Sequence, residues 1–209
     1  MKYQLALFDV DSTLIEQEVI DLLGNYSGQG QQIAEITAQA MQGELDFDQA
    51  LSKRVGLLEG LPESIILDVV EEISFSPGAL QLLGSLKDAG CKVGVVSGGF
   101  HNILDRLFTN LELDFLRANT LEVVEGTLTG KTVGPVINRQ AKAVALKEFA
   151  QMYGIALEKT VAVGDGSNDL EMIQVAGLGI SYRGKPILNA AADVVISEPN
   201  LMQVLEFLV

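Results

Sequence analysis

The sequence predicts an α/β fold, a doubly wound and mostly parallel sheet with a small helical domain inserted after the first strand. Three observations predict this fold. Short runs rich in Val, Ile and Leu recur along the chain, as do the strands of a parallel sheet covered on both faces. Helical patterns lie between most of these runs, which is the alternation of a doubly wound sheet. Residues 16–75, in contrast, contain no strand-like run and carry several helical patterns.

The predicted strands are short and apolar: Leu5–Phe8, Val93–Val96, Val161–Val163, Leu178–Ile180 and Val194–Ile196. The predicted helices show an amphipathic pattern: Ala79–Ala89, His101–Leu111, Gln140–Tyr153, Leu170–Ala176 and Leu201–Leu208. The segment Thr120–Val133 differs, because Gly126 and Gly130 interrupt short alternating stretches. It indicates a β-hairpin.

Glycine and proline positions separate the helical patterns of residues 16–75 at Gly24–Gly30, Gly43, Gly60 and Pro62. We therefore predict two units, an α/β core made of residues 1–15 and 76–209 and a helical cap made of residues 16–75. Because the insert follows the first strand, the cap would lie over the carboxyl ends of the strands, where open α/β sheets bind ligands.

Composition excludes several classes of protein. The chain has 28 acidic and 14 basic side chains and a formal net charge of -14, which argues against nucleic acid as a partner. Its single cysteine, Cys91, cannot form an intramolecular disulfide, which fits a reducing compartment. No apolar run approaches the roughly 18 residues of a membrane span. We expect a soluble, cytoplasmic protein with no membrane partner.

Asp9 and Asp11 directly follow the first predicted strand. Residues two apart in an extended segment point the same way, so both carboxylates can face one site. Paired carboxylates repel unless they share a cation or a proton, and a hard divalent metal ion such as Mg²⁺ is the simplest such cation. The alternative is that Asp11, Ser12 and Thr13 only cap the next helix.

A second polar group, Asp165, Asn168 and Asp169, follows another predicted strand. Asn168 or Asp169 can serve as a plain helix cap. Two carboxylates at this strand end would also complete an oxygen-rich metal site with the acids of the first strand.

Ser97, Gly98 and Gly99 lead from a third strand into a helix. Such a turn offers backbone N–H groups and a hydroxyl group to an anion at the positive end of a helix. A tight turn that needs glycine explains the same residues equally well.

Two basic residues face the apolar side of predicted helices. Lys142 shares a helical stripe with Leu146 and Phe149, so it points inward and needs an anion. Arg54 lies on the stripe of Phe47 and Leu51 in the insert. Its guanidinium can face a site, or its stem can lie on the core while its head reaches solvent.

Taken together and in order, these segments resemble the four motifs of the haloacid dehalogenase superfamily: Asp9–Thr13, Ser97–Gly98, Lys142 and Gly164–Asp169. With the insert segments Met41–Gly43 and Lys53–Val55, the chain resembles the phosphoserine phosphatase family of that superfamily over nearly its entire length. The resemblance implies a magnesium-dependent phosphatase that forms an aspartyl phosphate and releases serine in the last step of serine biosynthesis.

The resemblance also implies a role for each motif residue. Asp9 would be the nucleophile, and Asp11 would protonate the leaving oxygen and then activate water. Asp9, Asp165 and the backbone carbonyl of Asp11 would hold Mg²⁺, with Asp169 supporting the ion. The phosphate ligands would be Ser97, the Gly98 N–H group, Lys142 and Asn168.

Substrate choice would lie in the insert. By the same resemblance, Glu18 would bind the substrate ammonium group, Arg54 its carboxylate, and Met41 and Phe47 would form apolar walls. Spacing alone cannot distinguish Glu18 from Glu16 or Asp21.

Two alternatives follow from the same residues. A receiver-like signalling domain also accepts a phosphoryl group on an aspartate, although the Asp9 and Asp11 spacing and the helical insert argue against it. A phosphatase or phosphotransferase acting on another small metabolite, for example with homoserine as acceptor, would use the same motifs.

Overall fold

The computed structural model describes residues 2–41 and 44–208, and of Met41 the backbone alone. Its centre is a seven-stranded sheet in the order β4-β3-β2-β1-β5-β6-β7. The strands are β1 (Leu5–Phe8), β2 (Lys92–Phe100), β3 (Phe115–Val124), β4 (Thr127–Val133), β5 (Thr160–Gly164), β6 (Leu178–Tyr182) and β7 (Val194–Ile196). Every neighbouring pair is parallel except β3 and β4. The predicted doubly wound, mostly parallel sheet is confirmed.

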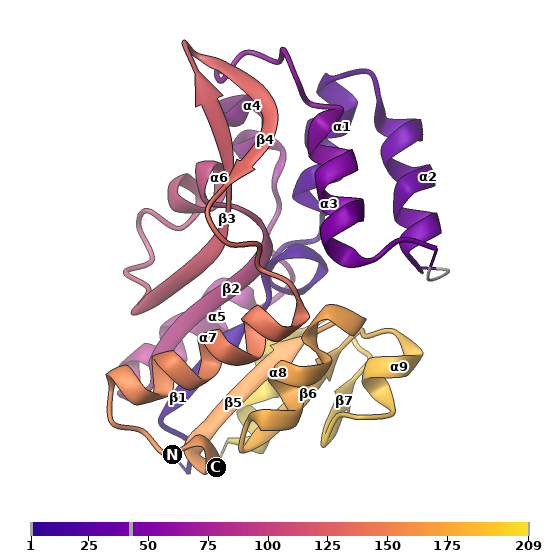
Figure 1. Ribbon diagram of the computed structural model, residues 1–209. Helices are drawn as coiled ribbons and strands as arrows, with labels where there is room; N and C mark the ends of the chain where they lie inside the picture. The colour runs from indigo at the N-terminus through magenta and orange to yellow at the C-terminus, as the bar shows by residue number, and fades with distance from the viewer. Residues whose placement is uncertain (1, 42–43, 209) are drawn as a thin grey trace.

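Helices cover both faces of the sheet (Figure 1). Leu5 and Leu7 of β1 belong to a core cluster that includes residues of α7 (Arg139–Met152), α8 (Leu170–Val175) and α9 (Pro186–Asn189). Ala6 and Phe8 belong to a second cluster that includes residues of α5 (Ala79–Asp88), α6 (His101–Leu107) and the 3-10 helix η4 (Leu201–Phe207). Successive residues of a strand point to opposite faces, and here both faces are buried, which explains the unbroken apolar run of β1.

The register of the central strands aligns their carboxyl ends. Phe8, the last residue of β1, pairs with Val95 of β2 on one side and with Val163 of β5 on the other. The polar segments that follow β1 and β5, and the Ser97 to Gly99 segment of β2, therefore emerge at one edge of the sheet. This edge is where open α/β sheets bind ligands.

The insert is helical, as predicted. It contains α1 (Val19–Tyr26), α2 (Gly30–Met41), α3 (Phe47–Gly56) and α4 (Ile65–Glu72), and α1 continues through Gly24, where the sequence indicated a break. The two connecting segments pair with each other through an isolated bridge between Ile15 and Phe75. A second attachment comes from the β3–β4 hairpin, because Gly60 N donates to Leu128 O at 2.9 Å and Leu128 N donates to Leu61 O at 2.8 Å.

Three boundaries differ from the prediction by more than two residues. β2 ends at Phe100 instead of Val96, so it includes Ser97, Gly98 and Gly99. β3 begins at Phe115 and pairs in parallel with β2 before it enters the predicted hairpin, and its polar residues Arg117 and Asn119 hide this strand in the sequence. The helix that begins at His101 ends at Leu107 instead of Leu111, where Thr109 Oγ1 donates to the Asp105 carbonyl and competes with the helical pattern. The segment after Asn200 is a 3-10 helix.

The buried Cys91 thiol gives a prediction for chemical labelling. Burial, followed by the nearby Asp114 carboxylate, raises the pKa of Cys91 to about 11. At pH 8 on the order of one native thiol in a thousand is then ionised, while an unfolded thiol has a pKa near 8.5. Iodoacetamide should therefore label the native protein far more slowly than the urea-unfolded protein, as followed by mass spectrometry. Equal labelling rates in the two states would contradict this placement of Cys91.

Candidate active site

A cavity of about 400 Å³ lies between the carboxyl ends of the strands and the helical insert. The core side of its lining comes from the segments after β1, β5 and β6 and from the glycine turn of β2: Asp9, Asp11, Gly98, Gly99, Asp165, Ser167, Asn168 and Lys185. The insert supplies the opposite wall: Glu18, Ile20, Asp21, Thr37, Ala40, Leu45, Phe47, Leu51 and Arg54. The cavity is therefore lined by polar groups and glycines on the sheet side, with three acids among them, and by mixed apolar and charged groups on the helical side.

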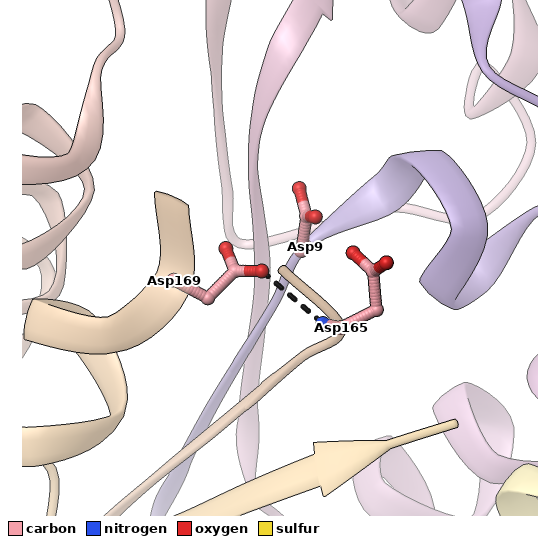
Figure 2. Close-up of side chains that lie close together, drawn as sticks. All are labelled: Asp9, Asp165 and Asp169. Carbon is pink, nitrogen blue, oxygen red and sulfur yellow. Dashed lines mark hydrogen bonds between the residues drawn. The ribbon is translucent and has the colours of Figure 1, made fainter. Parts of the chain in front are cut away.

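Three buried carboxylates meet at the base of this cavity. Asp9, Asp165 and Asp169 each offer one oxygen, and these oxygens lie within 4.8 Å of one another (Figure 2). Asp9 follows β1, whereas Asp165 and Asp169 belong to the turn after β5. Because β1 and β5 are neighbours in register, the sheet itself brings the two segments together. Oxygen donors at this spacing suit a hard divalent cation.

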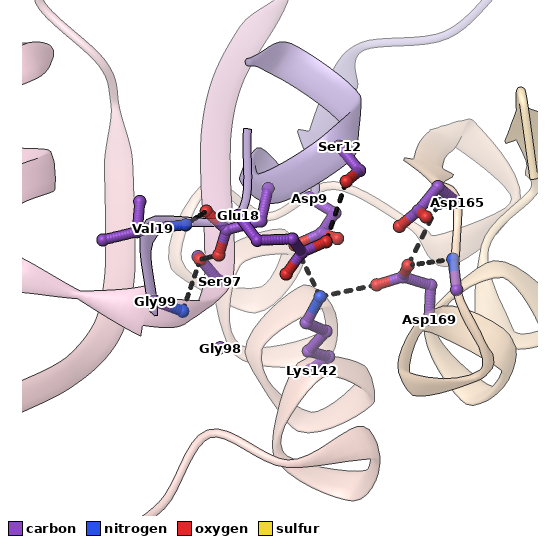
Figure 3. A network of polar contacts seen from close by, with 12 residues as sticks. Asp9, Ser12, Glu18, Val19, Ser97, Gly98, Gly99, Lys142, Asp165 and Asp169 are labelled. Atoms are coloured by element: carbon purple, nitrogen blue, oxygen red, sulfur yellow. Dashed lines mark hydrogen bonds and ion pairs between the residues drawn. The ribbon is translucent and has the colours of Figure 1, made fainter. Parts of the chain in front are cut away.

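Lys142 joins two of these acids. Its ammonium group donates to Asp9 Oδ1 and to Asp169 Oδ1, both at 2.6 Å, and its side chain is fully buried (Figure 3). The other oxygen of Asp169 accepts from the backbone N–H groups of Asp165 and Gly166 at 3.1 and 3.0 Å. Asp169 is thus occupied on both oxygens, which makes it a support for the turn more than a free ligand.

The turn after β5 requires glycine at one position. A Cβ atom at Gly164 would lie 2.4 Å from the Asp169 carboxyl carbon, closer than real side chains approach. Gly164 therefore leaves the space that the Asp169 carboxylate fills, and the apolar strand can lead directly into the acidic turn.

The negative charges of Asp9, Asp165 and Asp169 exceed the positive charge that the protein places beside them. Burial and the Asp169 carboxylate raise the pKa of Asp9 well above its ordinary value, although Lys142 opposes them. Burial, and then Asp169, raise the pKa of Asp165 to about 6. Burial alone would lower the pKa of Lys142, but Asp169 and Asp9 outweigh it and raise that pKa. Lys142 bonds to two of the three carboxylates and Lys185 opposes the third from a distance, so the acids still outnumber the ammonium groups and a further cation would relieve their repulsion.

Asp11 lies apart from the three acids and is held by two other groups. Its Oδ1 accepts from the Val19 N–H group and its Oδ2 from the Ser97 hydroxyl group, both at 3.2 Å. The Ser97 hydroxyl in turn accepts from Gly99 N at 2.7 Å. Burial, and then the Glu18 carboxylate, raise the pKa of Asp11 to about 7. A carboxyl group with such a pKa can both give and take a proton near neutral pH.

Glu18, Asp21 and Arg54 form the charged part of the insert wall. Ser12, whose φ of 56° lies in the left-handed region, donates from Oγ to Glu18 Oε1 at 2.8 Å. Among the described residues, the guanidinium of Arg54 hydrogen-bonds to neutral oxygens alone, Ala50 O at 3.3 Å and Thr37 Oγ1 at 3.5 Å. Phe47 lies beside the glycine turn, and an ideal Cβ at Gly98 would be 3.4 Å from its ring.

Known proteins that resemble this chain show its family. The family model for haloacid dehalogenase-like hydrolases matches residues 6–174. The phosphoserine phosphatase of Streptococcus thermophilus is 50% identical over 204 residues, which are 98% of this chain and 95% of that protein. The chain belongs to the phosphoserine phosphatase family of these hydrolases. Membership of a hydrolase family decides against the receiver-like alternative.

Two further proteins that this chain resembles are also phosphoserine phosphatases. The phosphoserine phosphatase of Mycobacterium tuberculosis is 49% identical over 97% of this chain, which spans about half, 49%, of that protein. A solved structure described as a phospho-aspartyl intermediate analogue of phosphoserine phosphatase superposes with a TM-score of 0.93 at 41% identity, covering 100% of both chains. Within the described residues, no helix is both long and apolar enough to cross a membrane.

The structure brings most of the predicted site residues to one cavity. The predicted residues that line it are Asp9, Asp11, Glu18, Phe47, Arg54, Gly98, Asp165 and Asn168. Ser97, Lys142 and Asp169 lie fully buried behind this lining and hydrogen-bond to it. The Met41 side chain lies outside the described residues. The carboxylate of Asp11 is absent from the acidic group, so a metal role for Asp11 rests on its backbone carbonyl and stays a prediction.

Residues that the sequence did not single out also line the cavity. Lys185 is one, and its charge opposes the rise in the pKa of Asp165. It comes shortly after β6, just before the proline that begins α9, and its N–H group donates to Asp165 O at 2.8 Å. Glu16 lies elsewhere, in an exposed ion pair with Arg183, whereas Asp21 lines the cavity beside Glu18.

Removal of Lys142 should destabilise the metal-free fold. Lys142→Met leaves buried carboxylates without their cation, and breaking a buried pair in this way costs about 3 kcal/mol. Lys147→Met is the matched control, because Lys147 is an exposed residue of the same helix. Urea unfolding in EDTA should show the loss for Lys142→Met and less than about 0.5 kcal/mol for Lys147→Met. Equal losses would mean that the buried pair contributes nothing specific.

Proposed function

We propose that this protein hydrolyses O-phosphoserine to serine and phosphate through an aspartyl phosphate on Asp9, with Mg²⁺ as cofactor. The observation that carries the proposal is the distribution of charge in the cavity. Asp9 and the glycine turn lie at the sheet side, while Arg54 and Glu18 lie on the insert side of the same cavity. A phosphate monoester that carries both a carboxylate and an ammonium group complements this set of charges.

The surroundings of Arg54 give the strongest support for a substrate that carries a carboxylate group. None of the ion pairs among residues 2–41 and 44–208 includes Arg54. Burial lowers its pKa, against the opposing effect of Glu18 and Asp21, so the charged group is partly stripped of water. A guanidinium in this position gains charge-assisted hydrogen bonds when a carboxylate arrives. Glu18 lacks a cationic partner among the same ion pairs and would bind the ammonium group.

The residues at the base of the cavity fit a divalent metal ion, because the three carboxylates of Asp9, Asp165 and Asp169 outnumber the ammonium groups of Lys142 and Lys185. Asp9 and Asp165 would hold Mg²⁺ with the backbone carbonyl of Asp11, and Asp169 would fix the turn from behind. The ion, when bound, supplies positive charge to the phosphoryl oxygens. Such support matters because phosphate monoesters are among the slowest biological bonds to hydrolyse.

In the first step, a carboxylate oxygen of Asp9 bonds to phosphorus and the bond from phosphorus to the serine oxygen breaks. That oxygen takes a proton from Asp11, which the Val19 N–H and Ser97 hydroxyl groups hold in place. Water then attacks phosphorus and gives a proton back to Asp11, the bond from phosphorus to the Asp9 oxygen breaks, and phosphate leaves with the Asp9 carboxylate restored. The phospho-aspartyl analogue of the related structure supports this intermediate.

The phosphoryl oxygens need positive groups while charge spreads over them. Lys142 uses two of its N–H bonds on Asp9 and Asp169, which leaves a third for the phosphoryl group. The Gly98 N–H group, the Ser97 hydroxyl group and Asn168 would complete this set. Residues 16–75 would act as the cap that closes the site against water, and the reaction would take place in the cytoplasm.

Metal binding should stabilise the fold through the acidic group. A ligand at 100 times its dissociation constant adds about 2.7 kcal/mol to stability, so excess Mg²⁺ should raise the Tm of the wild-type protein. Asp165→Asn should remove this gain yet be at least as stable as wild type in EDTA, because one repelling carboxylate is gone. Asp88→Asn, on the exposed end of α5, is the control and should keep the full gain. A full Mg²⁺ effect in Asp165→Asn would contradict the metal site.

Substrate recognition can be tested with three phosphate esters. Wild-type protein with Mg²⁺ should hydrolyse phosphoserine better than phosphoethanolamine, which lacks the carboxylate, and phosphoglycolate, which lacks the ammonium group. Asp9→Asn should be inactive on all three. Arg54→Ala should raise KM for phosphoserine roughly 30- to 100-fold, the value of a charge-assisted contact, and change KM for phosphoethanolamine less than threefold.

The matched variant for this experiment is Glu18→Gln. Glu18→Gln should raise KM strongly for phosphoserine, which has the ammonium group, and should change KM little for phosphoglycolate, which lacks it. If Arg54→Ala raises KM for phosphoserine and for phosphoethanolamine equally, Arg54 does not bind the carboxylate. If another phosphate ester is much preferred over phosphoserine, the substrate assignment is wrong while the chemistry on Asp9 stands.

A further inference from the structure

We propose that Asn119 is a positioning residue for phosphate binding, because its amide ties the glycine turn of β2 to the start of the helix that carries Lys142. The proposal rests on the proposed function only in that both concern the same phosphate-binding groups. Asn119 lies on β3, outside every motif that the sequence analysis identified, and its side chain is 1% exposed.

The need for such a residue comes from a gap in the sheet. β2 and β3 pair in register through Val96 and Arg117, and the next pair joins Phe100 to Asn119. Between these pairs, β2 has the three residues Ser97, Gly98 and Gly99 where β3 has Ala118 alone. The glycine turn therefore bulges out of the ladder, and its backbone groups need partners other than those of a regular parallel strand.

Asn119 supplies one of these partners. Its Nδ2 donates to the Gly98 carbonyl oxygen at 2.8 Å. This bond holds the peptide unit between Gly98 and Gly99, and the N–H group of that unit, which belongs to Gly99, donates to Ser97 Oγ at 2.7 Å. It therefore helps to fix the turn that carries Gly98 and the Ser97 hydroxyl group. Both ends of a buried amide must be satisfied.

The second bond reaches the segment just before α7, the helix that carries Lys142. Asn119 Oδ1 accepts from the Ile137 N–H group at 2.8 Å, and Ile137 is 4% exposed. The next residue, Asn138, caps α7 by accepting from Ala141 N at 3.1 Å, and its carbonyl accepts from Lys142 N at 3.0 Å. One amide thus joins the two elements that present the Gly98 N–H group and the Lys142 ammonium group.

The chain contains a matched control for a merely structural role. Asn102, on α6, also holds β3 with a pair of amide bonds, since its Nδ2 donates to Leu121 O at 3.2 Å and its Oδ1 accepts from Leu121 N at 2.8 Å. These bonds end on β3 and reach neither the glycine turn nor α7. If Asn119 only satisfied β3, substitution of either asparagine would have the same consequences.

The test compares Asn119→Asp with Asn102→Asp. Each change keeps the size of the side chain and an acceptor but replaces the amide donor with an oxygen. We expect Asn119→Asp to lower kcat/KM at least tenfold and to weaken binding of inorganic phosphate, measured by calorimetry with Mg²⁺, by a similar factor. For Asn102→Asp, both kcat/KM and the affinity for inorganic phosphate should stay within twofold of wild type, even if its Tm falls as far as that of Asn119→Asp. Asn119→Ser carries the same expectation and serves if the aspartate variant does not fold.

Four results would decide the role of Asn119. Unchanged kinetics and phosphate binding in the Asn119 variants would overturn the proposal, as would equal losses in the Asn119 and Asn102 variants. Binding of L-serine, which lacks the phosphate, should be unaffected by Asn119→Ser, and a loss there as large as the loss for phosphate would also overturn it. If wild-type protein hydrolyses no phosphate ester, the proposed function fails, and phosphate binding alone then decides the role of Asn119.

Discussion

The buried ammonium group of Lys142 is the interaction on which the site depends. It allows Asp9 and Asp169 to lie out of water at the ends of neighbouring strands, where two carboxylates alone would repel each other. It also fixes α7 against the carboxyl edge of β1 and against the turn after β5. A single side chain therefore sets the spacing between Asp9, the acidic turn after β5 and α7.

The same balance explains how a protein with a net charge of -14 can bind an anionic substrate. Charges beyond about 8 Å are largely screened at physiological ionic strength, so distant acids on the surface matter little. Arg54 and Lys185 line the cavity, and Lys142 lies buried behind it with its ammonium group on Asp9, so all three are close to where phosphate and carboxylate groups would bind. Local cations, with a metal ion beside Asp9 and Asp165, decide the field that the substrate meets.

Sequence reasoning succeeded where a residue belongs to a strong local pattern. Lys142 was placed inward because Leu146 and Phe149 mark the buried stripe, and the acids were placed together because parallel strands share one carboxyl edge. Asn119 and Lys185 were missed because their roles depend on partners distant in sequence. The gap in the β2–β3 ladder that makes Asn119 useful exists only after the strands have paired. The boundary between core and cap stays a prediction.

Phe47, at the start of α3, lies beside the glycine turn, so the insert reaches the sheet side of the cavity at this point. A methyl group at Gly98 would meet the Phe47 ring at 3.4 Å, which is ordinary van der Waals contact, so alanine would fit there. A larger side chain would have to displace the ring and the start of α3 with it. The distance between these two residues therefore limits how large a side chain the turn can carry while the insert keeps this position.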